Sequence, residues 1–269
     1  MEYEIKPKEN FDPGFRELWQ YRELFYFFAW RDIRVKYKQT VFGFAWAVFQ
    51  PLLMMVVFTL LFRDKASVSD IPYPVFSFSG LILWNIFASG ITASGNSMVA
   101  NANIIKKIYF PRLIIPVSSV LVALFDFLMT IPVLIILLAW YHVMPSLAFS
   151  WMLPASLLLA IFATIGPGCL LAALNVKFRD FRYVIPFLVQ FLLFATPVIY
   201  PQNYFHRRWV QELLALNPMS GAISLFRGFV TGVSPDATLC AISGISSLVF
   251  FILGIYVFRK TESYFADLA

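Results

Sequence analysis

Residues able to do acid–base, nucleophilic or metal chemistry are few in this chain, and they are scattered. The two histidines, His142 and His206, are far apart, and the two cysteines, Cys169 and Cys240, lack the spacing of metal ligands. The sequence contains no G-x-x-x-x-G-K-[ST] phosphate loop, no H-E-x-x-H and no G-x-S-x-G. We therefore expect no catalytic site, no metal site and no cofactor bound by this chain.

One carboxylate is an exception, because Asp126 falls deep inside a long apolar stretch. Acidic side chains at membrane depth are functional hypotheses by default. No lysine, arginine or histidine falls in the hydrocarbon region of another predicted span, so the sequence gives a proton relay no second member. We expect a structural role for Asp126, hydrogen-bonded or protonated within the bundle, and the relay stays open.

The elements that would position these residues are long apolar segments. Hydrophobic residues make up 60% of the chain and charged residues 13%, against about 25% charged in soluble domains. A helix of about 20 apolar residues crosses roughly 30 Å of hydrocarbon, and a backbone in lipid must satisfy its own hydrogen bonds. We expect an all-α integral membrane protein with six transmembrane helices, in residues 41–62, 75–99, 113–141, 150–176, 183–200 and 237–258.

The distribution of charge sets the expected topology. With the N-terminus placed inside, 16 of the 21 Lys and Arg residues fall on the cytoplasmic side and five outside. Both termini are then cytoplasmic, and the net charge of +6 reflects topology, so we expect no nucleic acid partner. The expected organisation is a cytoplasmic segment at 1–40, a six-helix transmembrane domain at 41–258 and a cytoplasmic tail at 259–269.

The N-terminal segment has the pattern of an amphipathic helix. Its polar and apolar side chains fall on opposite sides of a helical wheel, which is typical of a helix lying in the cytoplasmic interface. Arg31, Arg34 and Lys38 add a basic stripe, either an anchor on anionic lipid or a docking surface for a cytoplasmic partner. The apolar side consists of Phe15, Leu18, Trp19 and Phe25.

A second short cytoplasmic helix is expected between the second and third spans. Asparagines suit its start and Pro111 its end. An apolar ridge in the cytosol needs cover, and no cytoplasmic domain of this chain supplies it, so we expect another subunit to bury it. The residues of this predicted coupling helix are Asn101, Ile104, Ile105, Lys106, Lys107, Ile108, Tyr109 and Phe110.

Two further connections are informative. Residues 201–236 are too apolar for a free outer loop and predict two half-helices around Asn217-Pro218, which lipid tolerates only when they are buried in protein or line a cavity. The second cytoplasmic turn is short and basic. Its charged residues are Lys177, Arg179, Asp180 and Arg182.

The first predicted span carries three aromatic residues on one face, at i, i+4 and i+7: Phe42, Trp46 and Phe49. Aromatic stripes at helical spacing are most often packing, so the pattern alone leaves a cavity-lining role open. Gly43 and Pro51 in the same segment suit close packing and a bend.

Three stretches, 101–112, 174–201 and 217–228, together with 31–46, resemble the permease subunit of polysaccharide-exporting ABC transporters. That family exports lipid-linked O-antigens and teichoic acids, and the resemblance runs from about residue 15 to the end of the chain. It implies a homodimer in the bacterial cytoplasmic (inner) membrane, bound to two copies of a separate ATPase that uses ATP and Mg²⁺. The implied cargo is an undecaprenyl-pyrophosphate-linked glycan, of O-antigen type in our expectation.

The resemblance also implies roles for aromatic residues. Sugar C–H faces pack on aromatic faces without one fixed hydrogen-bond pattern, so a repeating polymer can slide past them. We expect the channel to be lined by Phe42, Trp46 and Phe49. We expect the outer gate to be formed, at the depth that aromatic residues favour, by Tyr200, Tyr204, Phe205 and Trp209.

Three other functions stay open at this point. A lipid or small-drug exporter of the same fold would have a narrower and less aromatic path. A membrane enzyme of glycan assembly would need paired carboxylates or a metal site at one interface. A stand-alone channel would leave the apolar coupling ridge without a purpose.

Overall fold

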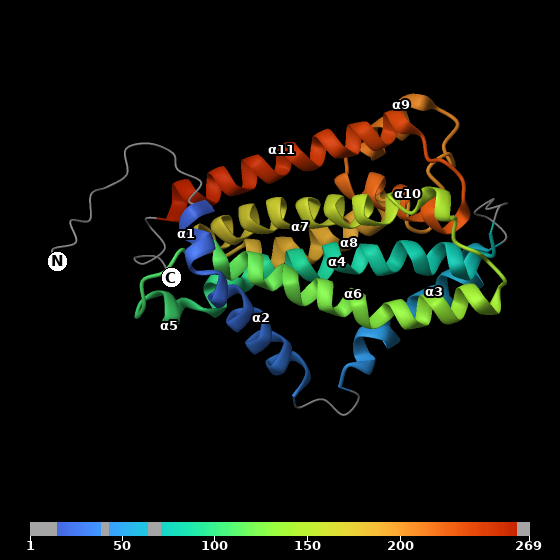
Figure 1. The fold of residues 1–269 in the computed structure, drawn as a ribbon. Coiled ribbons are helices and arrows are strands. Elements are labelled where there is room, and N and C mark those ends of the chain that lie inside the picture. The colour runs from blue at the N-terminus through green and yellow to red at the C-terminus, as the bar shows by residue number, and fades with distance from the viewer. Residues whose placement is uncertain (1–14, 39–42, 64–70, 263–269) are drawn as a thin grey trace.

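The computed structural model describes residues 15–38, 43–63 and 71–262, and these are all-α. The long helices lie side by side in one bundle (Figure 1). We call the end of the bundle that carries α5 the inner end and the end that carries α9 the outer end. The helices are α1 (Phe15–Gln20), α2 (Arg22–Tyr37), α3 (Ala45–Phe62), α4 (Tyr73–Ala100), α5 (Ala102–Ile105), α6 (Ile114–Trp140), η1 (Leu147–Phe149), α7 (Met152–Lys177), α8 (Phe181–Ala195), α9 (Arg208–Ala215), α10 (Pro218–Thr231) and α11 (Ala237–Thr261).

Five of these helices, α3, α4, α6, α7 and α11, are long and apolar enough to cross a membrane. The predicted span at 183–200 differs, because α8 has 15 residues and ends at Ala195. The chain beyond it is bound through its own carbonyl groups to α4 and α10, as described below, and does not continue the helix. The predicted half-helices are present as α9 and α10, which meet at an angle of 101° around Asn217-Pro218.

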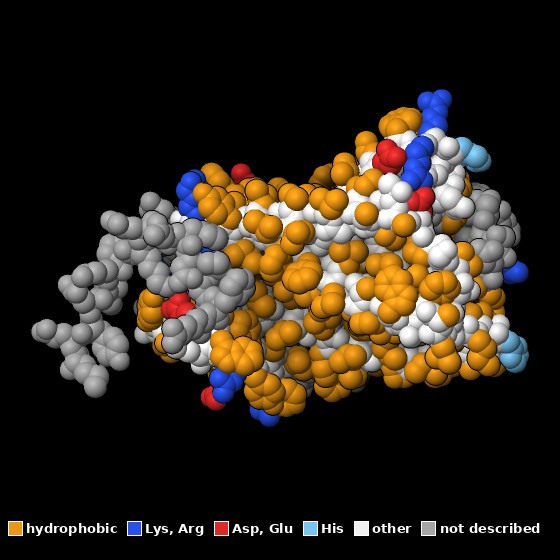
Figure 2. Space-filling model, turned by 45° about the horizontal axis from the view of Figure 1, so that its top comes forward, with side chains coloured by type: hydrophobic (Ala, Val, Ile, Leu, Met, Phe, Trp, Pro, Cys, Tyr) orange, Lys and Arg blue, Asp and Glu red, His pale blue; other side chains and the backbone are white. Residues whose placement is uncertain are grey.

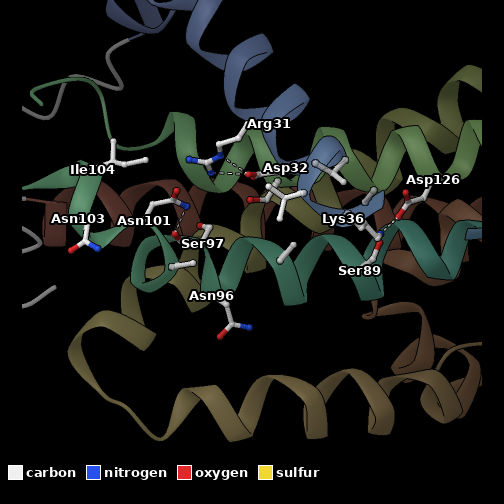
Figure 3. Close-up of a pocket in the computed structure, with 16 residues that line it drawn as sticks. Arg31, Asp32, Lys36, Ser89, Asn96, Ser97, Asn101, Asn103, Ile104 and Asp126 are labelled. Atoms are coloured by element: carbon white, nitrogen blue, oxygen red, sulfur yellow. Dashed lines mark hydrogen bonds and ion pairs between the residues drawn. The ribbon is translucent and has the colours of Figure 1, made fainter. Parts of the chain in front are cut away.

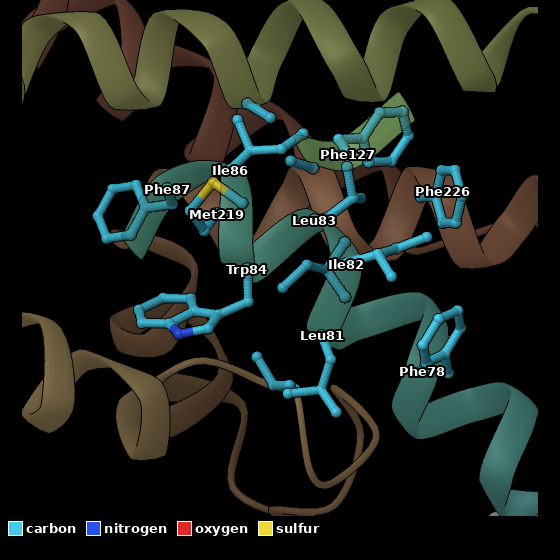
Figure 4. Close-up of a cluster of buried hydrophobic side chains, with 14 of the residues drawn as sticks. Phe78, Leu81, Ile82, Leu83, Trp84, Ile86, Phe87, Phe127, Met219 and Phe226 are labelled. Carbon is cyan, nitrogen blue, oxygen red and sulfur yellow. The ribbon is translucent and has the colours of Figure 1, made fainter. Parts of the chain in front are cut away.

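Helix α4 is the centre of the bundle. It is the most buried of the long apolar helices, with 78% of its most apolar window buried, and it packs against α3, α6, α7, α8 and α10. Figure 4 shows its middle turns, with Leu81, Ile82 and Leu83 surrounded by Phe127 of α6 and Phe226 of α10. The other helices pack around this core.

The surface has the distribution that a membrane protein needs. Figure 2 shows hydrophobic side chains over the middle of one face and charged side chains near its two ends. The outward apolar residues include Leu128 of α6, Leu158 of α7 and Leu248 of α11, each more than half exposed. Because such a belt is stable only in hydrocarbon, the chain is a multi-pass membrane protein.

Helices α7 and α11 approach each other at a pair of glycines. A Cβ built on Gly254 of α11 would lie 1.9 Å from the carbonyl oxygen of Gly166 on α7. Small residues at such crossings let helix backbones touch, which is how membrane helices gain packing energy without a hydrophobic driving force. The contact holds α11 on the bundle.

We expect Gly254→Ala to force α7 and α11 apart, because the new methyl group meets backbone and not a movable side chain. Overpacking of about 2 kcal/mol should lower the unfolding midpoint in detergent by roughly 5 °C or more. Gly244→Ala, on the same helix, is the matched control, since nothing lies within 4 Å of its Cβ position. Equal midpoints for the two variants would contradict this account of the α7–α11 contact.

Candidate translocation groove and subunit contacts

Two adjoining cavities of about 630 and 640 Å³ run along α4. The inner cavity lies between α2, α4, α5 and α6 near the inner end (Figure 3), and the middle groove lies between α3, α4 and α8. Four residues line both: Lys36, Ser89, Ala93 and Asp126. The cavities are therefore consecutive parts of one path through the inner half of the bundle.

Polar residues of α4 follow this path. Asn85, Ser89, Thr92 and Asn96 recur at i, i+4, i+7 and i+11, and each lines one or both cavities. The Ser89 hydroxyl donates to the carbonyl of Asn85 at 2.6 Å. Sequence reasoning missed this stripe, although a helical period of amides and hydroxyls within an apolar span was a visible signal.

The other walls of the middle groove combine aromatic and amide side chains. Trp46 and Gln50 come from α3, Trp84 from α4 and Gln190 from α8. Trp46 therefore lies in the groove wall, while its role in a glycan channel stays a prediction. Phe49 is 48% exposed and packs on Trp46 with ring centroids 5.7 Å apart, but it is not part of the groove wall; Phe42 lies outside the described residues.

The expectation that Asp126 has no charged partner is wrong. Its carboxylate accepts hydrogen bonds from the Lys36 ammonium and the Tyr37 hydroxyl, both near the end of α2. Sequence reasoning assigned Lys36 to a cytoplasmic segment. In the structure α2 packs against α6 and carries Lys36 to the level of Asp126, twelve residues past the start of α6.

Helix α2 therefore packs against the bundle and does not only lie in an interface. Phe28 and Ile33 are buried on its inward face. Of the predicted apolar side, Leu18 and Phe25 are partly buried against the bundle, whereas Trp19 is 71% exposed. The charged residues Arg31 and Arg34 have local partners, Asp32 and the Trp30 ring, while Lys38 ends the helix.

The predicted coupling helix is shorter, and fewer of its residues are exposed, than the sequence led us to expect. Its helix α5 has four residues, and Ile105 and Phe110 are buried in this chain, with Phe110 5.6 Å from Phe28 between ring centroids. Asn101 is also buried and donates to the Ser97 carbonyl at 2.8 Å, and Ile104 is partly buried. These residues are therefore not part of an exposed apolar ridge, because α2 covers it. The members of the predicted coupling helix that remain exposed are Lys106, Lys107, Ile108 and Tyr109.

The C-terminal end of α11 also contacts this segment. The backbone N–H of Arg112 donates to the Glu262 carboxylate at 3.0 Å, and Arg259 pairs with the same carboxylate at 2.8 Å. The chain that directly follows Ile108 and Tyr109 is thus anchored twice, at Phe110 by Phe28 and at Arg112 by Glu262. A partner that pushes on this loop acts on α2 and α11 together.

The second cytoplasmic turn lies at the same end of the bundle as α5 (Figure 1). Buried Asn175, at the end of α7, donates to the Gly95 carbonyl of α4 at 2.9 Å and so fixes where the turn begins. The inner end therefore has a basic exposed surface next to the coupling loop. All four predicted turn residues are exposed: Lys177, Arg179, Asp180 and Arg182.

At the outer end three of the predicted gate residues form a cluster. Tyr200, Tyr204 and Phe205 have ring centroids 5.3 to 5.7 Å from one another. Trp209 lies on α9 instead, is 60% exposed and takes no part in those three ring contacts. The side chains of His142 and His206 are also exposed.

A buried arginine explains why the segment before the gate is not helical. Arg227 of α10 donates to the carbonyl groups of Pro197 at 2.6 Å, Val198 at 2.7 Å and Phe76 at 3.1 Å. The side-chain amide nitrogen of Asn217 donates to the Thr196 hydroxyl at 2.6 Å, and its amide oxygen caps α10 by accepting from the backbone N–H of Met219 at 3.1 Å. These hydrogen bonds join two separate sequence motifs, 196–201 and 217–228. We call this joined structure the bracket, and it supports the outer aromatic cluster.

An ion pair fixes the outer helix α9. Arg208 donates to the Asp236 carboxylate at 2.6 Å, and Asp236 also caps α11 by accepting from the backbone of Thr238 at 2.9 Å. The Arg208 guanidinium and the cap hydrogen bonds lower the pKa of Asp236 to about 2. The carboxylate is therefore charged at neutral pH, and the link between α9 and α11 is intact there.

Comparison with known proteins identifies the family. The ABC-2 type transporter family matches residues 23–230, which include α2, the coupling loop, the groove and both half-helices. The chain belongs to the ABC-2 type transporter family. This ABC-2 permease is a transport component of an ABC transporter, and its family implies an ATPase partner.

Named relatives of this ABC-2 permease cover most of its length. It is 32% identical over 239 residues to the O-antigen export system permease protein RfbA of Klebsiella pneumoniae, covering 88% of this chain and 92% of that protein. It is 29% identical to the protein of the same name from Myxococcus xanthus, covering 94% and 97%. Its identity to the polysialic acid transport protein KpsM of Escherichia coli is 24%, covering 86% and 91%.

We expect Ile108→Asp to reduce co-purification of the ATPase partner about tenfold or more, because a carboxylate in an apolar contact is left without a partner. Insertion and yield of the permease should not change, since Ile108 is 62% exposed. Leu147→Asp is the matched control: Leu147 is 86% exposed, but on η1 at the outer end. Undiminished co-purification of the Ile108 variant would remove the coupling loop from the ATPase interface.

Proposed function

We propose that the chain is the transmembrane subunit of an ATP-driven exporter that moves a lipid-linked polysaccharide across the bacterial cytoplasmic membrane. The cargo is a glycan of O-antigen type on undecaprenyl pyrophosphate. Two copies of a separate ATPase bind ATP and Mg²⁺ and supply the energy, and this chain binds neither. The relatives named for O-antigen export are more similar to this chain than the one named for polysialic acid transport.

The observation that carries the proposal is the chemistry of the middle groove. Trp46, which is 46% exposed, gives a flat apolar face, and Asn85 and Gln190 give amide donors and acceptors. Sugars have both kinds of surface, C–H faces and hydroxyl groups, so a chain of them is matched by this wall along its length. A path for a lipid or an apolar drug would not need the polar stripe of α4.

The groove is incomplete in one chain, which supports a homodimer. Helix α3 has few buried residues, and α8 has a single buried residue, Ile185. Exposed Phe187, Phe191 and Phe194 on α8 continue the outward surface beside the groove. We propose that a second copy covers α3 and α8, so that the two grooves face each other around one channel.

The orientation follows from the same arrangement. The coupling loop, the second turn and both termini are cytoplasmic in this proposal, and the inner cavity opens toward the ATPase. The bracketed aromatic cluster of Tyr200, Tyr204 and Phe205 then closes the outer end when no glycan passes. Trp209 lies beside it and contributes at the membrane surface.

The function is tested in cells that lack this chain but retain its ATPase and the glycan-assembly enzymes. We expect lipid-linked polysaccharide to accumulate inside and to be missing from the cell surface, and the intact chain to restore it. Accumulation of a lipid without glycan would favour a lipid exporter. Normal surface polysaccharide without the chain would contradict the proposal.

We expect Trp46→Ala to slow polysaccharide export about tenfold, because stacking on an aromatic ring is worth about 1–3 kcal/mol. ATPase co-purification should stay normal, since Trp46 is far from the coupling loop. Trp140→Ala is the control, because Trp140 ends α6 and is 77% exposed outside both cavities. Equal export by the two variants would exclude Trp46 from the glycan path.

A further inference from the structure

The junction between the inner cavity and the middle groove contains an ion pair. Lys36 and Asp126 line both cavities, and so does Ser89 on the facing turn of α4. Figure 3 shows Lys36 extending from α2 to Asp126 with Ser89 beside it. These three side chains, together with Ala93, therefore lie where the two cavities meet.

The two side chains of the pair differ in exposure and in their other partners. The Asp126 side chain is 13% exposed and keeps a second donor, the Tyr37 hydroxyl, if Lys36 leaves. The Lys36 side chain is 45% exposed, flexible and faces the cavities. If the ion pair separates, the carboxylate therefore still has a hydrogen-bond donor. This lowers the free-energy penalty of separating two charges in a low dielectric. Lys36 is the member free to move.

The ion pair is also connected to the groove wall, through aromatic contacts of Tyr37. The Tyr37 ring lies 4.6 Å from Phe44 and 6.5 Å from Phe125 between centroids, and Phe44 lies 5.7 Å from Phe125. Phe44 directly precedes α3, the helix that carries Trp46. At the other end of α2, Phe28 packs on Phe110 of the coupling loop. Helix α2 thus connects the coupling loop to the ion pair and to the start of α3.

We propose that Lys36 and Asp126 form an inner gate, which separates the inner cavity from the middle groove in the idle transporter and opens during export. This rests on the proposed function for its cargo. Hydroxyl groups or an anionic phosphate linkage of the passing chain give Lys36 a new acceptor, while Tyr37 keeps Asp126 paired. The same geometry argues against a proton relay, because the carboxylate already has two donors.

Cysteine accessibility tests the gate without any cargo. Starting from a chain with Cys169 and Cys240 replaced by serine, Asn96→Cys reports on the inner cavity and Asn85→Cys on the middle groove. Inside-out vesicles that contain the permease and its ATPase, without ATP or glycan, are treated with a membrane-impermeant maleimide. We expect the thiol at position 96 to react much faster than the thiol at position 85.

Opening the gate by mutation should change only one of these rates. Asp126→Asn and Lys36→Met should each raise labelling at position 85 about tenfold, the effect of losing one charged hydrogen bond, and leave position 96 unchanged. The exchange Lys36→Asp with Asp126→Lys should restore slow labelling at position 85. Arg34→Met is the matched control, because Arg34 is a cation of α2 that lines neither cavity.

Three results would overturn the gate: fast labelling at position 85 in the starting chain, no increase in the neutral variants, or no recovery in the charge exchange. A purely structural tether would instead reduce the amount of folded permease or raise labelling at both positions. Because the assay contains no glycan, its outcome is independent of whether the cargo has been identified correctly.

Discussion

Polar groups in a hydrocarbon layer need partners inside the protein, and this constraint shapes every part of the structure that matters for transport. The stripe of amides and hydroxyls on α4 turns away from lipid into the groove. The Asp126 carboxylate obtains its donors from α2, which must run down along α6 to supply them. The two terminal nitrogens of the Arg227 guanidinium donate to carbonyl groups that a continuing α8 would have used itself.

These contacts fall into two groups, one at the outer end of the bundle and one at the inner end. At the outer end the bracket of Arg227 and Asn217 holds the chain after α8 against α4 and α10. At the inner end the coupling loop rests on Phe28, and α2 leads from there to the pair at the cavity junction. In the proposed exporter, movement of the ATPase on the coupling loop would reach the groove by a short route, through α2 alone.

Much of this was predictable from the sequence, for reasons that are local. Long apolar segments gave five spans, and Asn217-Pro218 in an apolar stretch gave the half-helices. What sequence could not give were contacts between distant segments. Lys36 and Asp126 are 90 residues apart, so a lysine in a basic N-terminal segment gave no sign of its partner. Ile105 and Phe110 looked like a free ridge because the helix that covers them, α2, resembled an interface helix. The early end of α8 depends on Arg227, 32 residues beyond it.

In the proposed mechanism the glycan passes along the middle groove. The most direct measurement is site-specific photocrosslinking in cells that export the polysaccharide, with a benzophenone amino acid in place of Gln190 in the groove or of Leu158 on the outward face of α7. The account predicts that the permease with the probe at position 190 becomes covalently linked to polysaccharide, and that the probe at position 158 captures only lipid. Equal capture of polysaccharide at both positions, or none at position 190 during active export, would contradict it.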